Sequence, residues 1–294
     1  MPVSLALIVV THNSHRWLAA FFDSWHAMLA ARGPSAGMAV RTIVADAGSS
    51  AGQFSVLPSF ARDGTIVRLG NIGYGAAANA GAKAAGDATH LLICNPDLTF
   101  PGDFARTFLD SLATGVAPFG EQACIAPRLL NPDGSVQPSV GQFLTIWGTI
   151  ADQFRRREHR KYLHPQPTEL CAIDWPMAAC LLIRREAFEA VGGFDERFFL
   201  YVEEVDLCRR LRDGGREVWF EPGATVVHHS PNAARAPRPE VQRYAARGVL
   251  RYFAKHGSWG QLALYRLLAM ASGRLSVGEA LASRRRIVER STGP

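Results

Sequence analysis

The apolar run His90–Cys94 ends at Asn95-Pro96-Asp97, and this junction places a side chain well suited to chemistry. A short apolar run of this kind predicts a buried strand. Pro96 cannot continue the strand's hydrogen bonding, so Asp97 follows at its carboxyl end. Open α/β sheets bind ligands at that edge, where a fixed carboxylate suits a divalent cation and the cation suits a diphosphate. The structural alternative is an Asp that caps the next helix or turn.

Other acidic and histidine residues also follow apolar segments. They are Asp46, the pair Glu203 and Glu204, and the pair His228 and His229. Because the carboxyl ends of parallel strands share one edge of a sheet, these residues can meet in one cleft. Asp97 with His228 is a donor set for Mg²⁺ or Mn²⁺, whereas a strand-end His alone is more often structural. One Glu of the pair, at the start of a helix, is a candidate general base; an acidic first turn also suits the helix dipole without any catalytic role.

Composition indicates a globular chain with a sizeable core. It has 294 residues, of which 48% are hydrophobic and 20% are charged. The apolar run Leu5–Val10 is too short to span a membrane and has no basic residue before it, so we expect neither a signal peptide nor an anchor. The five cysteines form no CxxC pair, which favours the reducing cytoplasm.

Positive charge is concentrated near the C-terminus. From Arg235 onward there are twelve Arg or Lys residues and three Glu residues, a balance of +9, which leaves −3 of the whole-chain +6 for the first 234 residues. A basic tail on a mildly acidic body favours an anionic partner such as a phospholipid or a lipid-linked phosphate. The alternative is a solvated helical face. Because we find no recognition motif, we expect no nucleic acid.

Strand and helix patterns alternate along the first 230 residues. Strands are expected at residues 5–10, 41–45, 65–69, 90–94, 178–183 and 224–227, with those at 90–94 and 178–183 buried, and helices at 76–85 and 203–212. This order predicts an α/β fold with a Rossmann-like, mostly parallel sheet and helices on both faces. Beyond the Pro-rich stretch 230–239 only helices are expected. The predicted division is therefore a catalytic domain, 1–230, and a basic helical C-terminal extension, 231–294.

The segment Gly73–Ala78 matches the GxGxxA pattern of dinucleotide-binding turns. It follows the third predicted strand rather than the first, and it gives Glu203, Glu204 and the histidines no role. A dinucleotide-dependent oxidoreductase that uses Gly73, Gly75 and Ala78 is therefore an alternative, and a non-catalytic glycan-binding module is another.

Several stretches together resemble bacterial family 2 glycosyltransferases of the GT-A fold, in the rhamnosyltransferase-like branch. The matching stretches are Val9–Ser14, Ala45–Ser49, Asn71–Gly75 with Asn79 and Gly81, Leu92–Asp97, Asp174-Trp175 with Ala179–Arg185, Phe198–Arg210 and Val226–His229. They occur in the family's order over residues 4–230. The resemblance implies an inverting, metal-dependent hexosyltransferase that acts in cell-surface polysaccharide biosynthesis, with rhamnose among the candidate sugars.

The resemblance also implies residue roles. Nucleotide-sugar binding falls to Thr11, Asn13, Asp46, Asn71, Gly73, Tyr74, Asn79, Asn95 and Trp175. Asp97 and His228 would hold Mn²⁺ or Mg²⁺, with Asn95 in place of the first acid of a DxD-type motif. Glu204 occupies the position of the base, which is commonly Asp in the family, so Glu203 remains a rival. Pro176-Met177-Ala178 departs from the family's smaller turn and leaves the sugar open.

The expected substrates are a nucleoside-diphosphate sugar and a glycan or polyprenyl-diphosphate-linked acceptor. We expect peripheral docking of a cytoplasmic protein on the anionic inner face of the cytoplasmic membrane. The supporting segments are the apolar stretch Phe143–Phe154 before the basic run Arg155–Lys161, the residues Arg243, Arg247 and Arg251 on one helical face, and the apolar run Leu262–Met270. The alternative is that this last run packs against the catalytic domain.

Overall fold

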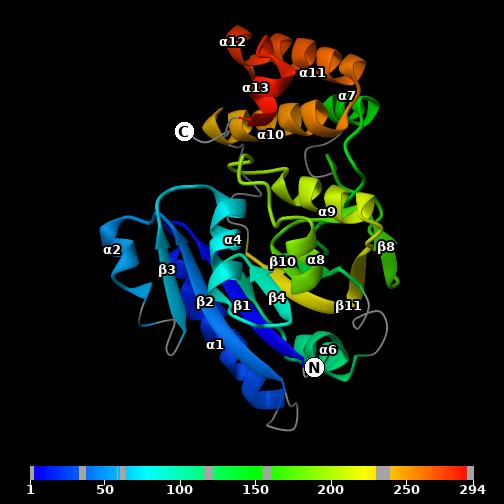
Figure 1. The fold of residues 1–294 in the computed structure, drawn as a ribbon. Helices are drawn as coiled ribbons and strands as arrows, with labels where there is room; N and C mark the ends of the chain where they lie inside the picture. Colours follow the sequence, from blue (N-terminus) through cyan, green and yellow to red (C-terminus); the bar gives the residue numbers. More distant parts are fainter. Residues whose placement is uncertain are drawn as a thin grey trace.

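A nine-stranded sheet with helices on both faces forms the body of the protein (Figure 1). The computed structural model, in which these strands are counted, describes residues 3–32, 38–57, 59, 64–115, 122–154, 160–229 and 239–289. The predicted α/β fold with a mostly parallel central sheet is confirmed. Within the described residues, no helix combines the length and the apolar composition that crossing a membrane requires.

The first four major strands are parallel and form half of the sheet in the order β3-β2-β1-β4. Their bounds are Ser4–Thr11 for β1, Ala39–Ala47 for β2, Thr65–Leu69 for β3 and His90–Cys94 for β4. The side chains of β1 alternate between two cores, with Leu5 and Leu7 in one and Ala6 and Ile8 in the other. Because both faces are covered, the strand reads as a continuous apolar run.

The second half of the sheet is mixed. Its strands are β5 Leu98–Thr99, β6 Cys124–Leu130, β8 Cys171–Ile173, β10 Cys180–Arg184 and β11 Val218–His228. The strand expected at 178–183 is β10, and it runs antiparallel to both β4 and β6. The strand expected at 224–227 is the end of the longer β11, whose register with β6 shifts between Glu221 and Thr225. Two short strands, β7 Val140–Gly141 and β9 Trp175–Pro176, form a separate pair.

Helices cover the two faces as separate groups (Figure 1). One group comprises α1 His15–Arg32, α5 Gly102–Phe104, the π-helix η2 Ala105–Asp110 and α6 Ser111–Thr114. The other comprises α4 Tyr74–Ala84, α8 Arg185–Ala190 and α9 Glu203–Asp213. The short α2, Ala51–Phe54, follows β2. The helices predicted at 76–85 and 203–212 are α4 and α9.

Helices alone form the described part of the C-terminal region, as expected. They are α10 Pro239–His256, α11 Trp259–Ala271, α12 Val277–Ala280 and α13 Arg284–Glu289, and α7 Ile146–Phe154 lies beside α11 (Figure 1). On α11, Leu262, Tyr265 and Ala269 are buried, while Leu267 is exposed. The apolar run 262–270 therefore packs along one face only.

The basic face predicted for α10 is wrong at one of its three positions. Arg251 is buried, with its guanidinium over the Phe198 ring, and Arg247 pairs with Glu279 at 2.6 Å. Burial also lowers the pKa of Arg251 to about 10. Arg243 remains exposed. Residues 155–159 of the predicted basic run lie outside the described residues.

Buried ion pairs join α10 to α9. The carboxylate of Asp206 accepts from Arg210 at 2.8 Å, from Lys255 at 2.8 Å and from His256 at 2.8 Å. Lys255 also donates to Asp195 at 2.8 Å. The pKa of Asp206 is lowered because these donors outweigh the cost of its burial. The Asp206–Arg210 pair is thus part of a network that fixes the helical extension to the body.

Candidate active site

The carboxyl ends of β1 and β2 bring Thr11 and Asp46 together, because these two residues are paired in the sheet register. The backbone N–H of Ser49 donates to Asp46 Oδ2 at 3.2 Å. Asp46 Oδ1 and Thr11 Oγ1 are both buried, and neither has a hydrogen-bond partner in the described structure. A buried acceptor without a donor is costly. The two atoms are therefore suited to a ligand that brings its own polar groups, such as a nucleoside.

Asn13 and Asn71 border the same loops. The Asn13 side-chain oxygen accepts from the backbone N–H of Ser50 at 2.9 Å, while Ser49 Oγ accepts from the backbone N–H of Asn13 at 2.8 Å. Asn71 is exposed, and its backbone lies against Gly48. The structure therefore brings together Thr11, Asn13, Asp46 and Asn71, which were predicted from widely separated motifs.

Asp97 and His228 face each other at the neighbouring part of this edge. Asp97 Oδ1 lies 3.3 Å from His228 Nε2, and the backbone N–H of His229 donates to the Asp97 carbonyl at 2.9 Å. His228 Nδ1 lies 2.7 Å from Gln137 Oε1, which can only accept, so Nδ1 carries the proton. In the neutral ring, Nε2 then presents a lone pair toward Asp97.

This pair fits a divalent ion. A lone pair that faces a carboxylate oxygen is stabilised by a cation between them, either a proton on Nε2 or a metal ion, and two adjacent ligands about 2.1 Å from one octahedral ion lie about 3 Å apart. Among the described residues there is no group of three or more His, Cys, Asp and Glu side chains that could hold a metal. An ion here would therefore complete its coordination with ligand oxygens and water, as Mg²⁺ commonly does with substrate phosphates.

The adjacent carboxylates Glu203 and Glu204 begin α9. Glu203 is buried and Glu204 is half-buried, and each has one buried carboxylate oxygen without a hydrogen-bond partner in the described residues. Burial raises the pKa of both carboxyls, and the neighbouring Glu204 charge raises that of Glu203 further. A carboxylate with a raised pKa is a stronger proton acceptor once ionised.

The Glu203 and Glu204 carboxylates lie near the end of β4, because Tyr74 is close both to them and to Cys94. Burial raises the pKa of Tyr74 well above its usual value, and the nearby Cys94, Glu203 and Glu204 raise it further. Cys94 directly precedes Asn95-Pro96-Asp97. The Tyr74 hydroxyl itself donates to the Ala178 carbonyl at 2.7 Å. One edge of the sheet thus carries Thr11 and Asp46, the pair Asp97 and His228, and the pair Glu203 and Glu204.

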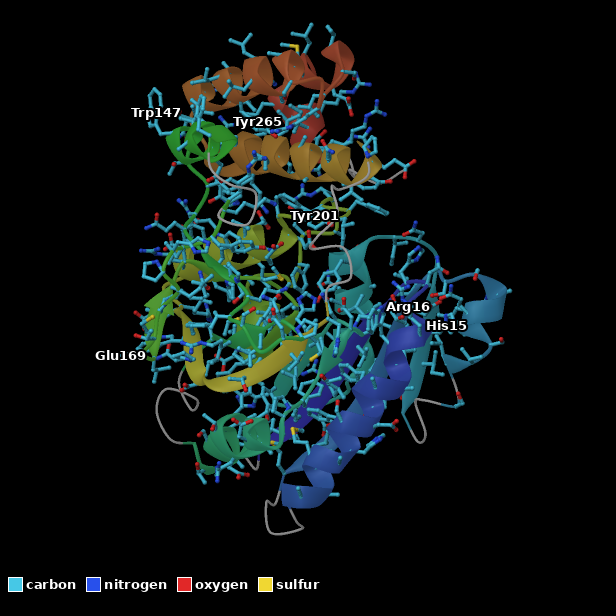
Figure 2. The ribbon with its side chains drawn as sticks, turned by 180° about the vertical axis from the view of Figure 1, so that it is seen from behind. His15, Arg16, Trp147, Glu169, Tyr201 and Tyr265 are labelled. Carbon is cyan, nitrogen blue, oxygen red and sulfur yellow. The ribbon has the colours of Figure 1, made fainter. Side chains whose placement is uncertain are left out.

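The loop that leads into α9 is strained. Tyr201 and Val202 have positive φ angles of 69° and 73°, which is costly for a β-branched residue. Tyr201 lies between α9 and α10 (Figure 2). The loop is also held at Gly73, where an added Cβ would lie 2.3 Å from the Phe199 carbonyl oxygen. The glycine of the GxGxxA match therefore allows close packing of the backbone against Phe199 of this loop.

Two predicted binding residues have structural partners instead. The Asn79 side chain exchanges two 2.9 Å hydrogen bonds with the backbone of Phe194. Trp175 is buried in the core and donates from its ring nitrogen to the Gln142 carbonyl at 2.7 Å. Trp175 thus lies inside the core, whereas Asn79 is half-buried and also donates to Glu196 Oε1 at 3.0 Å. Asn95 is half-buried, and its backbone N–H donates to the Ala179 carbonyl.

Several residues near the site had no sequence signal. Gln137 contacts His228, which is 91 residues away in the sequence. The charge of Lys161 lowers the pKa of Glu203 and of Glu204, opposing the rise that burial causes. Burial raises the pKa of Tyr162, and the charge of the nearby Glu204 raises it further. Only the turn at Asn131–Gly134, just before Gln137, was detectable in the sequence.

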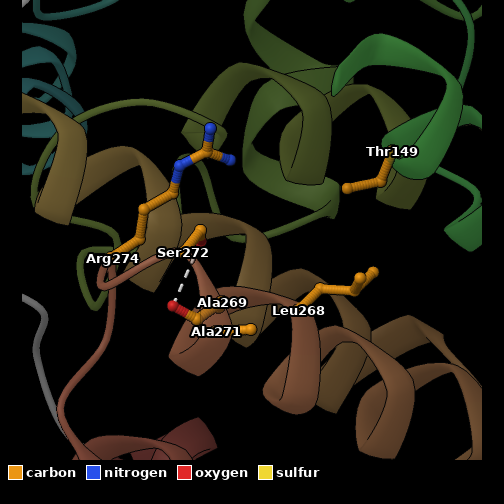
Figure 3. Close-up of a pocket in the computed structure, with 6 residues that line it drawn as sticks. All are labelled: Thr149, Leu268, Ala269, Ala271, Ser272 and Arg274. Atoms are coloured by element: carbon orange, nitrogen blue, oxygen red, sulfur yellow. Dashed lines mark hydrogen bonds between the residues drawn. The ribbon is translucent and has the colours of Figure 1, made fainter. Parts of the chain in front are cut away.

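A separate shallow pocket of about 280 Å³ lies between α7 and α11 (Figure 3). Thr149 contributes from α7, and Leu268, Ala269 and Ala271 contribute from α11, with Ser272 and Arg274 in the turn that follows. It lies among the C-terminal helices, away from the strand ends that carry the candidate active site (Figure 1).

Comparison with known proteins relates the chain to sugar-transferring proteins. It is 31% identical to the N-acetylglucosaminyl-diphospho-decaprenol L-rhamnosyltransferase of Mycobacterium tuberculosis over 209 residues, which cover 64% of this chain and 66% of that protein. It is 30% identical to rhamnosyltransferase WbbL of Escherichia coli K12 over 83 residues, 28% of this chain and 31% of that protein. The matches thus span less than two thirds of these relatives' lengths. No protein-family model matches the chain.

Solved structures share the fold. The chain superimposes over 99% of its length on 55% of GalNAc-T7, crystallised with UDP, GalNAc and Mn²⁺, with a TM-score of 0.64 and 13% identity. It superimposes over 96% of its length on 77% of the mannosyltransferase PcManGT from Pyrobaculum calidifontis, in complex with GDP-Man and Mn²⁺, with a TM-score of 0.56 and 15% identity. The chain is similar in sequence to rhamnosyltransferases and has the GT-A fold of glycosyltransferases. This GT-A assignment agrees with the clustering of Asp46, Asp97 and Glu204 at one sheet edge.

Proposed function

We propose that the protein is an inverting glycosyltransferase that moves a sugar from a nucleoside diphosphate to an acceptor hydroxyl. The observation that carries the proposal is the Glu203–Glu204 pair, whose raised pKa values and unpartnered oxygens lie at the same edge as Asp97 and His228. One edge of the sheet thus offers a proton acceptor beside a place for a diphosphate.

Glu204 is the proposed base. It is less buried than Glu203, so its carboxylate is the more accessible of the two to an incoming hydroxyl. It accepts the proton as the acceptor oxygen bonds to the anomeric carbon and the bond to the diphosphate breaks, in one displacement with inversion. Binding of both substrates at one edge supplies their orientation.

Asp97 and His228 are the proposed holders of Mn²⁺ or Mg²⁺. When bound, such an ion neutralises charge on the departing diphosphate. The buried acceptors Asp46 Oδ1 and Thr11 Oγ1 bind the nucleoside, and the exposed Asn71 lies beside them. The oxygen of Asp46 is suited to an N–H donor of a base.

The proposed acceptor is linked to a polyprenyl diphosphate and the proposed donor sugar is rhamnose, because the mycobacterial relative carries both in its name. A lipid-linked acceptor places the protein at the inner face of the cytoplasmic membrane. The described surface offers an apolar stripe on α11, where Trp259 and Leu267 are 67% and 60% exposed and two turns apart. Arg284 lies over the Trp259 ring, and Trp147 of α7 points outward nearby (Figure 2). Such a stripe with a basic rim suits anionic phospholipid.

The test is a transfer assay with purified protein, dTDP-, UDP- and GDP-sugars, Mn²⁺ and a polyprenyl-diphosphate-linked N-acetylglucosamine acceptor. We expect one donor to yield a product with inverted anomeric configuration, read by NMR. Retained configuration would exclude the single displacement. Absence of transfer from every donor, with binding of NADH, would favour the oxidoreductase alternative.

A further inference from the structure

The turn after β6 is connected by hydrogen bonds to the histidine that faces Asp97. Within this turn, the backbone N–H of Asn131 donates to the Ser135 carbonyl at 2.8 Å. The chain then returns beside β6, where the backbone N–H of Gln137 donates to the Leu129 carbonyl at 2.9 Å. Gln137 is 7% exposed, so its side-chain amide is inside the protein. The turn therefore supplies a buried amide to His228 from a distant part of the sequence.

A directional chain of hydrogen bonds begins at Asp133. Its exposed carboxylate accepts from the Ser135 hydroxyl at 2.6 Å, and this bond lowers the pKa of Asp133. Since the hydroxyl proton is used there, Ser135 Oγ must accept from the Asn131 side-chain amide, at 2.9 Å. The first two links thus fix which end of the Asn131 amide is the donor.

The same logic continues inward. With its nitrogen facing Ser135, Asn131 presents Oδ1, which accepts from Gln137 Nε2 at 3.2 Å. Gln137 then presents Oε1 to His228 Nδ1 at 2.7 Å, so Nδ1 must donate. Turning the Gln137 amide around would place two oxygens against each other at Asn131. An ionised surface carboxylate therefore fixes the tautomer of a buried imidazole four hydrogen bonds away.

We propose that Gln137 is a positioning residue that holds His228 in the Nδ1–H tautomer and keeps its Nε2 lone pair directed at Asp97. The inference deepens the proposed function, because a metal ion between Asp97 and His228 requires that lone pair. A metal-bound histidine commonly donates its other ring N–H to a fixed acceptor, and loss of such a partner costs about 10- to 100-fold in metal affinity.

The tautomer can be measured without metal, donor or turnover. Protein labelled with ¹⁵N-histidine is examined by long-range ¹H–¹⁵N correlation in EDTA, and His228 is assigned by the loss of its signals in His228→Gln. We expect a protonated Nδ1 in the wild type, whether or not Nε2 also carries a proton shared with Asp97 in the absence of metal. An unprotonated Nδ1 would overturn the proposal, whether or not the protein transfers sugar.

Three variants test the role of Gln137. Gln137→Met keeps the length of the side chain but removes the acceptor, and we expect tautomer exchange and an Mn²⁺ affinity about 10- to 100-fold weaker by EPR titration. Gln137→Glu keeps an acceptor for Nδ1–H, although its second oxygen faces Asn131 Oδ1, and should keep the Nδ1–H tautomer that Gln137→Met loses. The control is Gln166→Met, because Gln166 Oε1 accepts from the backbone of Ser139 and Val140. It should leave the His228 signals unchanged.

The outcomes separate this inference from the proposed function. If Gln137→Met keeps both the Nδ1–H tautomer and the Mn²⁺ affinity of the wild type, Gln137 does not position His228. If the wild type has the expected tautomer but does not bind Mn²⁺, the hydrogen-bond chain stands and the metal assignment fails. Should Gln137→Met not fold, Ser135→Ala interrupts the chain at its exposed end and should allow the second tautomer to appear.

Discussion

Gly248 of α10 packs directly against the carbonyl oxygen of Tyr201. A Cβ at position 248 would lie 2.7 Å from that oxygen and 3.1 Å from a methyl group of Val202. Both residues have positive φ, and Glu203 follows them in the chain. The helical extension therefore holds the strained loop that presents the proposed base.

Gly248→Ala should disturb catalysis more than folding. The methyl group pushes against Tyr201 and displaces Glu204, so we expect kcat to fall on the order of 10- to 100-fold with little change in nucleotide affinity. The gain in helix propensity, about 0.5–1 kcal/mol, offsets part of the packing cost. Gly278→Ala in α12 is the control, because its added Cβ would meet nothing within 4 Å. An equal kcat in both variants would contradict the proposed coupling.

Glu204→Gln should lose transfer and keep donor binding. The amide preserves the shape of the side chain but cannot accept the proton, so kcat should fall by about 10²–10⁴. Isothermal titration with the nucleoside diphosphate and Mn²⁺ measures the binding that remains. If Glu203→Gln is inactive while Glu204→Gln turns over normally, the base is Glu203.

Glu203→Gln should make the fold less sensitive to alkaline pH. The pKa of Glu203 is raised above its ordinary value of 4.5, mainly by burial, so the folded state retains a proton that the unfolded chain releases. In the window between the ordinary and the raised pKa, the free energy of unfolding therefore falls as pH rises. The uncharged amide removes this loss. Urea unfolding at pH 5 and pH 8 should show a smaller decrease for Glu203→Gln than for wild type or the exposed-site control Glu240→Gln.

Asp97→Asn should abolish metal-dependent nucleotide binding. Loss of the carboxylate removes one of the two protein ligands proposed for the ion, and we expect activity to fall on the order of 10²-fold or more. Circular dichroism and calorimetry with UDP and dTDP, with Mn²⁺ or EDTA, separate folding from binding. Asp103→Asn, at an exposed position in α5, is the control. Wild-type affinity that is the same in EDTA would contradict the metal assignment.

Trp259→Ser and Leu267→Ser should weaken binding to anionic vesicles. Burying one such side chain is worth about 1.5–3 kcal/mol, so each substitution should lower the partition by roughly 10- to 150-fold. Flotation with phosphatidylglycerol vesicles at two salt concentrations measures the partition, which salt should reduce. Leu170→Ser replaces another exposed leucine, next to β8 and away from α11, and should have no effect. If all three variants bind the vesicles equally, the α11 stripe does not mediate membrane binding.

The apolar runs predicted the fold well, because local hydrophobicity marks buried strands. The runs at 5–10 and 90–94 are the buried strands β1 and β4. The direction of β10 was not predictable, since Leu181–Ile183 reads the same in a parallel or an antiparallel strand. The length of β11 was also missed, because Pro222 and Gly223 interrupt the pattern where the register with β6 shifts.

The candidate site was predictable only where residues follow strand ends. Asp46 and Asp97 met this condition, and the sheet register brings Asp46 to Thr11. Lys161 and Gln137 did not, because their positions depend on contacts across 42 to 91 residues of chain. The burial of Arg251 was missed for a related reason. Its i, i+4 spacing with Arg247 specifies a helical face, but the neighbour that covers the face is known only from the fold.

The buried cluster around Asp206 has a consequence for protein engineering. Lys255 and His256 of α10 neutralise a carboxylate that belongs to α9, so neither side is electrostatically complete without the other. An enzyme that exchanges residues 239–289 with those of a relative would inherit an unmatched charge in its interior. Chimeras that exchange these helices should therefore use crossover points that keep Asp195, Asp206 and α10 from the same parent.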